Sequence, residues 1–216
     1  MKTSVTTFGI CLLFILTVVN SMTIATDKVK IQSVPLKSGK TLYVGGTGEG
    51  NYSNIRDAIN DATDGDTVFV FDDSSPYYEN IIVDKSINLI GENKDTTVID
   101  GGELTNVVVF FTDGIFLSGF TIINCKTDPL DHCAGVRVYT NNSIINNNNI
   151  CENGYNGIHL ECSSKNNVIS ENYIAYNYRN GIIISKNSNS NFIFNNIIEY
   201  NDLGGSYGVV FFTVIE

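Results

Sequence analysis

The chain has 216 residues, enough for one domain with a sizeable core, and its length demands no second domain. A formal net charge of −10 and a pI near 4.5 exclude a nucleic acid or an anionic membrane as partner, because such binding depends on clustered Lys and Arg. Charged residues make up 17% of the chain and apolar residues 43%, so uncharged polar residues, chiefly Asn, take the place of charge.

The N-terminal segment predicts export. Lys2 is followed by an apolar run of twelve residues, Phe8 to Val19, with the small residues Ser21 and Ala25 after it. A membrane span needs roughly 20 apolar residues, whereas a shorter run with this flank is typical of a signal peptide. We expect a cleaved signal peptide over residues 1–25, a secreted or cell-surface protein, and no membrane span after cleavage. An uncleaved anchor is the alternative.

The polar segment 26–40 predicts an N-terminal extension with little structure, and the main domain is expected over residues 41–216. Thr41–Val44 predicts a short strand. The Gly-rich run at residues 45–50 is expected to form a turn, since no Gly-Lys-Ser/Thr motif makes it a phosphate-binding loop.

One helix is expected next, with Ser53 as its N-cap. Its apolar face is formed at helical spacing by Ile55, Ala58, Ile59 and Ala62. Short strands follow, at Thr67–Phe71, Ile81–Val83, Ile87–Ile90, Thr97–Ile99, Val107–Phe111 and Ile115–Leu117. Strands of this length with almost no helices between them leave a sandwich, a barrel or a solenoid.

An internal repeat of 24 residues favours the solenoid. The repeated columns are Ile145, Ile169 and Ile193; Asn148, Asn172 and Asn196; Ile150, Ile174 and Ile198; and Asn153, Asn177 and Asn201. Gly157 matches Gly181, but the next equivalent, Gly208, arrives three residues late. An earlier copy begins at Phe120 and resumes at Gly135 after six extra residues.

This pattern predicts an all-β, parallel β-helix with three faces, in which successive coils are separated by roughly 4.8 Å. We expect the Asn columns to form side-chain amide ladders at the bends, where Asn also tolerates a positive φ. The chain ends at Val209–Glu216, inside an expected strand. We therefore expect either a solenoid truncated at its C-terminus or a protein whose open last coil stacks end to end with a partner.

Three motifs in residues 41–102, Gly65-Asp-Thr-Val, Ile87-Asn-Leu-Ile-Gly and Val98-Ile-Asp-Gly-Gly, resemble the N-terminal part of pectate-lyase-like proteins. The Asn-rich coils resemble NosD-type repeat proteins. This resemblance implies a right-handed parallel β-helix with an N-terminal capping helix. Its families include polysaccharide lyases, glycoside hydrolases, epimerases and adhesins, so the fold alone does not give the function.

Cleavage of the signal peptide would remove Cys11 and leave four cysteines in an exported chain, which favours disulfides. The four are Cys125, Cys133, Cys151 and Cys162. Pairing of Cys125 with Cys133 would close a short loop and leave Cys151 to pair with Cys162. Asn51 and Asn141 begin sequons for glycosylation.

A candidate site follows from side-chain alternation on the strands. Arg137, His159 and Ile183 are expected to share one outer column, and Tyr139, Glu161 and Ser185 the next. The six-residue insertion leads into these columns. The candidate patch consists of Asp131, His132, Arg137, Tyr139, His159 and Glu161.

The catalytic candidates in this patch are Asp131, Arg137, His159 and Glu161. Two carboxylates suit a hydrolase, whereas a base beside a cation suits a lyase. Tyr139 and His132 are the candidate ligand contacts, and Tyr155, Tyr173, Tyr176 and Tyr178 form a possible sugar-stacking strip. His132, Cys133 and His159 offer copper-type donors, but no second motif reinforces them, so we predict no metal site and no cofactor.

The sequence predicts a secreted or cell-surface domain that binds an extracellular polysaccharide or surface polymer without catalysis, or that serves as a structural surface module. A polysaccharide lyase or glycoside hydrolase is the first alternative. The second alternative, implied by the NosD-type resemblance, is an accessory of copper-site maturation.

Overall fold

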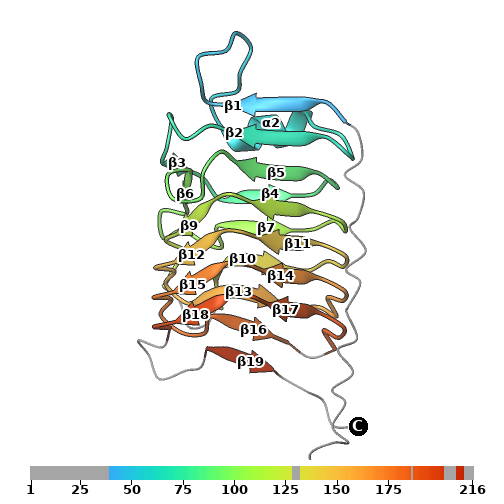
Figure 1. Ribbon diagram of the computed structural model, residues 1–216, viewed down its shortest axis with the longest axis vertical. Helices are drawn as coiled ribbons and strands as arrows, with labels where there is room; N and C mark the ends of the chain where they lie inside the picture. The colour runs from blue at the N-terminus through green and yellow to red at the C-terminus, as the bar shows by residue number, and fades with distance from the viewer. Residues whose placement is uncertain (1–38, 128–131, 186, 202–207, 212–216) are drawn as a thin grey trace, which may run out of the picture. The chain divides into compact units, whose positions relative to one another are not determined.

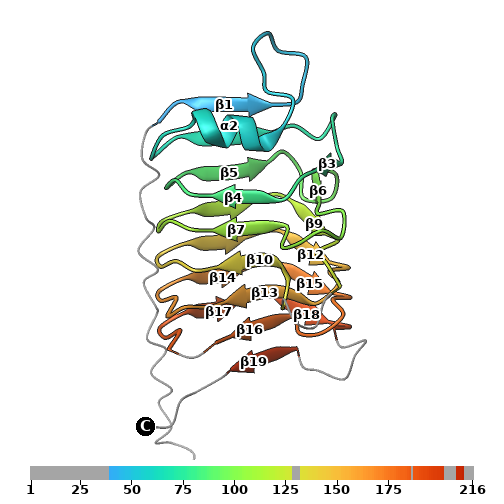
Figure 2. The ribbon, with the colours of Figure 1, turned by 180° about the vertical axis from the view of Figure 1, so that it is seen from behind.

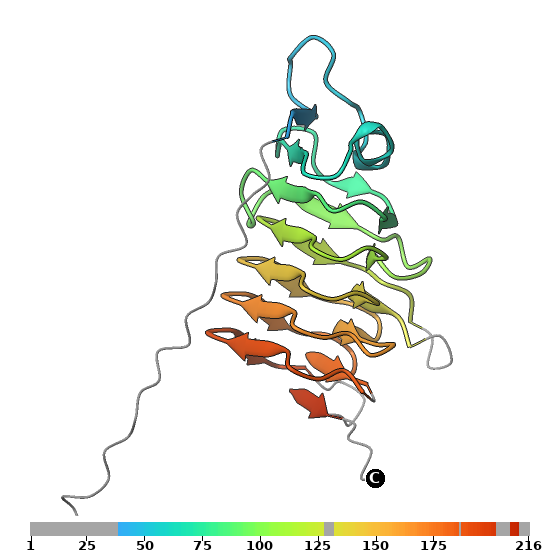
Figure 3. The same ribbon diagram turned by 90° about the vertical axis from the view of Figure 1, so that its right-hand side faces the viewer.

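The computed structural model describes residues 39–127, 132–185, 187–201 and 208–211, which belong to one compact unit. The predicted signal peptide and most of the predicted extension lie outside the described residues. The strands form three sheets in which all neighbours are parallel, and the chain visits the sheets in turn as it winds around one core (Figure 1). Viewed from the side, the coils lie one upon another (Figure 3). The predicted right-handed parallel β-helix is confirmed.

From β2 onward each sheet collects one strand from each coil, and sheet A also contains β1. Sheet A contains β1 (Thr41–Val44), β2 (Thr67–Val70), β5 (Asn88–Gly91), β8 (Phe116–Ser118), β11 (Ile144–Asn146), β14 (Val168–Ser170) and β17 (Phe192–Phe194). Sheet B contains β3 (Tyr77–Tyr78), β6 (Val98–Asp100), β9 (Thr121–Ile123), β12 (Asn149–Cys151), β15 (Tyr173–Ala175) and β18 (Ile197–Glu199). Sheet C contains β4 (Ile81–Val83), β7 (Val108–Phe110), β10 (Ala134–Val138), β13 (Asn156–Leu160), β16 (Ile182–Ile184) and β19 (Val209–Phe211).

The helix of the described residues, α2 (Ile55–Asp61), lies beside β1 and β2 near the N-terminal end (Figure 2). Its N-cap is Asn54, whose side chain accepts a hydrogen bond from the Asp57 N–H at 2.8 Å. The predicted cap, Ser53, is therefore wrong by one residue. In the described part of the chain, no helix is long and apolar enough to cross a membrane.

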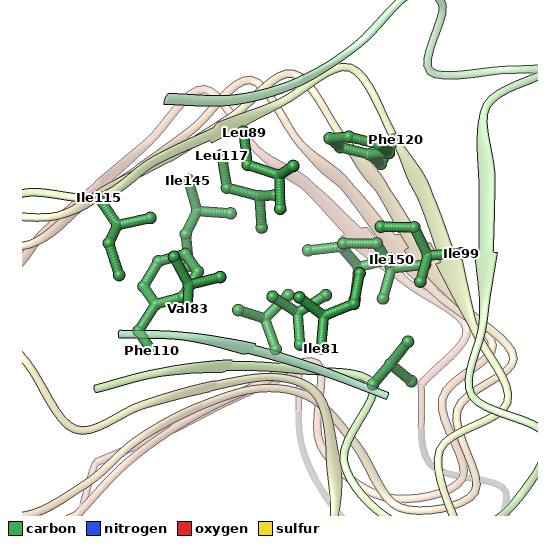
Figure 4. Close-up of a cluster of buried hydrophobic side chains, with 14 of the residues drawn as sticks. Ile81, Val83, Leu89, Ile99, Phe110, Ile115, Leu117, Phe120, Ile145 and Ile150 are labelled. Atoms are coloured by element: carbon green, nitrogen blue, oxygen red, sulfur yellow. The ribbon is translucent and has the colours of Figure 1, made fainter. Parts of the chain in front are cut away.

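Apolar side chains at equivalent strand positions stack to form the core. Leu89, Leu117 and Ile145 are direct partners on successive strands of sheet A, and all three are buried. Side chains from the three sheets converge on the same interior (Figure 4). Burial of each such side chain contributes about 1.5–3 kcal/mol, so the stacking of coils supplies the hydrophobic stabilisation that one coil lacks.

The bends between sheets repeat a two-residue form, a residue with positive φ followed by an inward-pointing residue. The positive-φ residues are Gly114, Asn142, Asn166 and Ser190 at one bend, Gly119, Asn147, Glu171 and Asn195 at the second, and Asn124, Glu152, Tyr176 and Tyr200 at the third. The ladder asparagines, such as Asn148, come directly after these residues. The prediction that asparagine adopts a positive φ at the bends is confirmed, for Asn147, Asn166 and Asn195 among others, and these residues precede the ladder asparagines.

The predicted amide ladders are confirmed. The side-chain oxygen of Asn172 accepts hydrogen bonds from the N–H and the Nδ2 of Asn148, at 3.0 and 3.1 Å. Asn172 in turn donates from both of its nitrogens to the oxygen of Asn196, and its Nδ2 also reaches the Ile145 carbonyl at 2.9 Å. The same pattern joins Asn153 to Asn177 and Asn201, and Asn167 to Asn191.

Both predicted departures from the 24-residue register are confirmed. The stretch from Ile122 to Val136 is longer than the stretch between their strand partners, Ile150 and Ile158. The difference is the six-residue insertion before β10. At the C-terminal end of the repeat region, Val209 pairs with Ile182. The interval between these two residues is longer than the 24-residue repeat by the expected three residues.

We expect replacement of Asn172 by Ala to destabilise the fold by about 2–4 kcal/mol, because it leaves the buried Asn148 N–H without its acceptor and removes the side-chain hydrogen bond to the Ile145 carbonyl. The matched control is Asn189→Ala at an exposed position, which should change the free energy of unfolding by less than about 0.5 kcal/mol. Urea unfolding followed by circular dichroism measures both variants. Equal losses in the two variants would show that the ladder adds no stability.

Candidate functional site

The outer face of sheet C carries the predicted site columns. Strand pairing places Arg137 directly beside His159, and His159 beside Ile183. The column continues toward the N-terminus through Val109 and Ile82. The predicted first column is therefore present, and its N-terminal half is apolar.

The second column contains an aromatic pair, of which the sequence had predicted Tyr139 as a site residue but not Phe111. The rings of Phe111 and Tyr139 are stacked, with their centroids 5.2 Å apart and their planes inclined by 17°. Phe111 follows β7 and is 57% exposed, so its ring presents an open apolar surface. We call this pair the aromatic shelf.

An ion pair fixes the C-terminal side of the aromatic shelf. The Arg137 guanidinium donates to one carboxylate oxygen of Glu161, from Nε at 3.0 Å and from Nη2 at 2.6 Å. The same guanidinium lies 5.3 Å from the centre of the Tyr139 ring, within cation–π range. Burial acts to raise the pKa of Glu161, but the hydrogen bond and charge of Arg137 outweigh it and lower the pKa. Glu161 is therefore a carboxylate that already has its counterion.

His159 is much less accessible than its outward position predicts. It is 4% exposed, and its Nε2 lies 2.8 Å from the Ser185 hydroxyl. No hydrogen-bond partner reaches its Nδ1 within the described part of the chain. Burial lowers the pKa of His159 to about 4, so the imidazole is neutral at neutral pH. A buried neutral imidazole cannot contact a polymer on the outer surface.

The remaining patch residues do not join the aromatic shelf in the described structure. His132 is exposed, and its ring packs edge-on against Tyr155 at 5.3 Å between centroids. Asp131 lies outside the described residues, as does Asp128 of the same insertion. The pairing of Asp131 with Glu161 as hydrolase carboxylates therefore stays a prediction.

A cavity of about 350 Å³ opens beside the aromatic shelf. Its lining residues are Arg56, Asn80, Ile81, Ile82, Thr105, Asn106, Val109, Phe111 and Tyr139. The lining combines apolar and aromatic side chains with amides, a hydroxyl and one guanidinium, but contains no carboxylate and no imidazole. The sequence could have predicted the position of Phe111. Val109 pairs with Arg137, and the same interval along the chain aligns Phe111 with Tyr139.

The predicted tyrosine strip is divided. Tyr155 is buried, and the Arg179 guanidinium covers its ring at 5.2 Å, so it offers no sugar-binding surface. Tyr176 stacks on its equivalent in the next coil, Tyr200, with centroids 5.2 Å apart and an interplanar angle of 7°. Tyr178 is exposed. Burial raises the pKa of the Tyr173 hydroxyl to about 12.

The structure contains neither predicted disulfide, and all four cysteines are thiols. Cys151 ends β12 of sheet B, whereas Cys162 follows β13 of sheet C, and their pairing stays a prediction. Cys125 and Cys133 are both buried and close enough to interact electrostatically, so their pairing stays a prediction. Burial raises the pKa of Cys125 to about 12.

The two sequon asparagines make contacts through their side chains. The Asn51 amide donates to the Gly45 carbonyl at 2.6 Å, and the Asn141 amide lies 3.3 Å from an Asp113 carboxylate oxygen. Glycosylation at either asparagine stays a prediction.

Among the described residues, no group of three or more His, Cys, Asp or Glu side chains is arranged to hold a metal ion. His132, Cys133 and His159, the donors considered for copper, are thus not such a group.

A family model described as a right handed beta helix region matches residues 105–213, just over half of the chain. The chain belongs to the right-handed β-helix family. Comparisons with curated proteins and with solved structures find no match.

The pKa of His159 makes the stability of this β-helix depend on pH. Its pKa falls from 6.5 to about 4 on folding, so between these values the unfolded chain binds a proton that the folded chain does not. Stability is therefore complete above the unfolded value and decreases as the pH falls toward the folded value. We expect His159→Gln to lose less stability than the wild type between about pH 7 and about pH 5.

The matched control is His132→Gln, which replaces the other histidine of the chain at an exposed position. Because burial is the main cause of the lowered pKa of His159 and the charge of His132 a smaller one, the pH dependence measured by urea unfolding at both pH values should change much less in this variant than in His159→Gln. If His159→Gln keeps the full wild-type dependence, the assignment of a buried neutral imidazole is wrong.

Proposed function

We propose that the outer face of sheet C binds a carbohydrate polymer without cleaving it. The observation that carries this proposal is the aromatic shelf, which lies open beside a cavity whose rim bears amides and a guanidinium. A sugar ring has an apolar face of C–H groups and an edge of hydroxyls. A stacked aromatic pair matches the face, and Asn80, Asn106 and Arg56 match the edge.

The arrangement favours binding over hydrolysis. A glycoside hydrolase needs two carboxyl groups on either side of the scissile bond, roughly 5–9.5 Å apart. The cavity lining has no carboxylate, and Glu161 beside it is held by Arg137. The lyase alternative needs an accessible base, and His159 is buried with its Nε2 at the Ser185 hydroxyl.

A carbohydrate array followed by calorimetry with the polysaccharides that bind would test the proposal. We expect Phe111→Ala to weaken binding by about tenfold, because an aromatic stack contributes about 0.5–1.5 kcal/mol and a factor of ten in affinity corresponds to about 1.4 kcal/mol. Tyr139→Ala should do the same. The matched control is Tyr78→Ala on sheet B, an exposed aromatic residue outside the cavity, which should bind as the wild type does.

The same samples decide between binding and catalysis. Incubation with each bound polysaccharide should release no reducing ends and no unsaturated product that absorbs ultraviolet light. Release of either product would replace the proposal by the hydrolase or the lyase alternative. Binding that is the same in Phe111→Ala and in the wild type would remove the aromatic shelf from the function.

We expect the proposed binding to take place outside the cell, because the apolar run Phe8–Val19 and the small residues after it predict a signal peptide. We expect the protein recovered from the secreted or cell-surface fraction of its host to lack this run. N-terminal sequencing should find the mature chain to begin after Ser21 or Ala25. A chain that retains Phe8–Val19 would instead support the membrane-anchored alternative.

A further inference from the structure

A second group of aromatic side chains lies on the outer face of sheet A, on strands other than those of the aromatic shelf, and consists of exposed Tyr43 and half-buried Phe69 and Phe71. Tyr43 of β1 and Phe69 of β2 are direct strand partners with ring centroids 6.1 Å apart. Phe71, just after β2, lies 5.9 Å from Tyr43 and 5.2 Å from Phe69. Tyr43 is 45% exposed. Neither the hydrophobic core nor the proposed carbohydrate site accounts for this cluster.

The glycine-rich turn after β1 closes over these rings. Gly45 and Gly46 have φ values of +73° and +70°, which residues with side chains rarely adopt. A Cβ on Gly46 would lie 2.8 Å from the Phe71 ring, so glycine allows the main chain to approach the aromatic face. The Gly46 N–H donates to Asp73 at 2.9 Å, and the Asn51 amide donates to the Gly45 carbonyl at 2.6 Å. These bonds hold the turn in place.

The turn and the rings border an open, solvent-accessible cavity of about 420 Å³, compared with about 350 Å³ for the one beside the aromatic shelf. Its lining residues are Tyr43, Gly46, Thr47, Gly48, Asn51, Phe71 and Asp73. The lining therefore combines two aromatic side chains, a carboxylate, an amide and a hydroxyl, and it contains no Lys or Arg.

The charge of the cavity is negative. Asp73 accepts hydrogen bonds through its Oδ1, from Gly46 and from Ser74, while no described residue donates to its Oδ2. The neighbouring Asp72 lies outside the lining, and its Oδ2 accepts a hydrogen bond from the Thr96 hydroxyl at 2.6 Å. An anionic ligand would be repelled by Asp73, whereas a cation gains from this carboxylate and from the electron-rich faces of the aromatic rings.

We propose that this cavity binds an organic cation of the alkylammonium class, with its charged head group beside Asp73 and its methyl or methylene groups on Tyr43 and Phe71. The open Oδ2 of Asp73 and the ring faces supply the two contacts that such a head group needs. The site is independent of the proposed carbohydrate site because it lies on sheet A and shares no lining residue with it.

Choline and its neutral carbon isostere 3,3-dimethylbutan-1-ol test the proposal, because they have nearly the same shape and differ in charge. Each is titrated into the ¹⁵N-labelled full chain, and the amide signals of Gly46, Thr47 and Gly48 are followed by NMR. We expect choline to shift these signals with a millimolar dissociation constant and the isostere to bind about tenfold more weakly. Equal binding of the two probes, or no shift with choline, overturns the proposal.

Two substitutions locate the cation. Asp73→Asn removes the charge but keeps an oxygen for the Gly46 N–H, so the turn stays in place, and choline affinity should fall about tenfold. The matched control is Asp72→Asn, which removes a carboxylate outside the cavity lining and should change the affinity less than about threefold. Wild-type affinity in Asp73→Asn, or an equal loss in both variants, would contradict the site.

Discussion

The buried asparagine amide is the group on which the rest of this β-helix depends. An amide in an apolar interior costs free energy unless its oxygen and both hydrogens are hydrogen-bonded. In Asn172 the coil before supplies two donors and a carbonyl acceptor, and the coil after supplies the Asn196 oxygen. Each buried Asn therefore has its bonds satisfied by an amide oxygen at the same phase of the next coil. This requirement keeps successive coils aligned, and where the ladders run from Asn to Asn the interval is 24 residues.

Fixed coil length also determines what the outer face can carry. Because equivalent strand positions coincide, one substitution per coil builds a continuous column, as from Val109 through Arg137 to His159. The six-residue insertion before β10 leaves this register intact, since Val136 still pairs with Ile158. The outward-facing side chains of sheet C can thus differ from coil to coil while the asparagine ladders at the bends keep their hydrogen bonds.

The sequence predicted the features that repeat and missed those that do not. The strands, the ladders and the outer columns follow from a period that any two copies reveal. Phe111 was missed because its coil is longer than the coils of the clean 24-residue region. His159 was correctly placed on the outer face, but alternation gives the direction of a side chain and not the cover that its neighbours provide. The N-cap at Asn54 was missed because Ser53 and Asn54 are both good caps, and the backbone geometry selects between them.

The ladders also have a direction. In each described step the N–H and the Nδ2 donate to the amide oxygen of the C-terminal coil, and the oxygen accepts from the N-terminal coil. The Nδ2 also donates to a main-chain carbonyl of the N-terminal coil, as from Asn172 to Ile145. An asparagine inside a ladder therefore joins its own coil to the coils on both sides, as Asn172 does to Asn148 and Asn196. A substitution in one coil for this reason removes hydrogen bonds from two coil junctions at once.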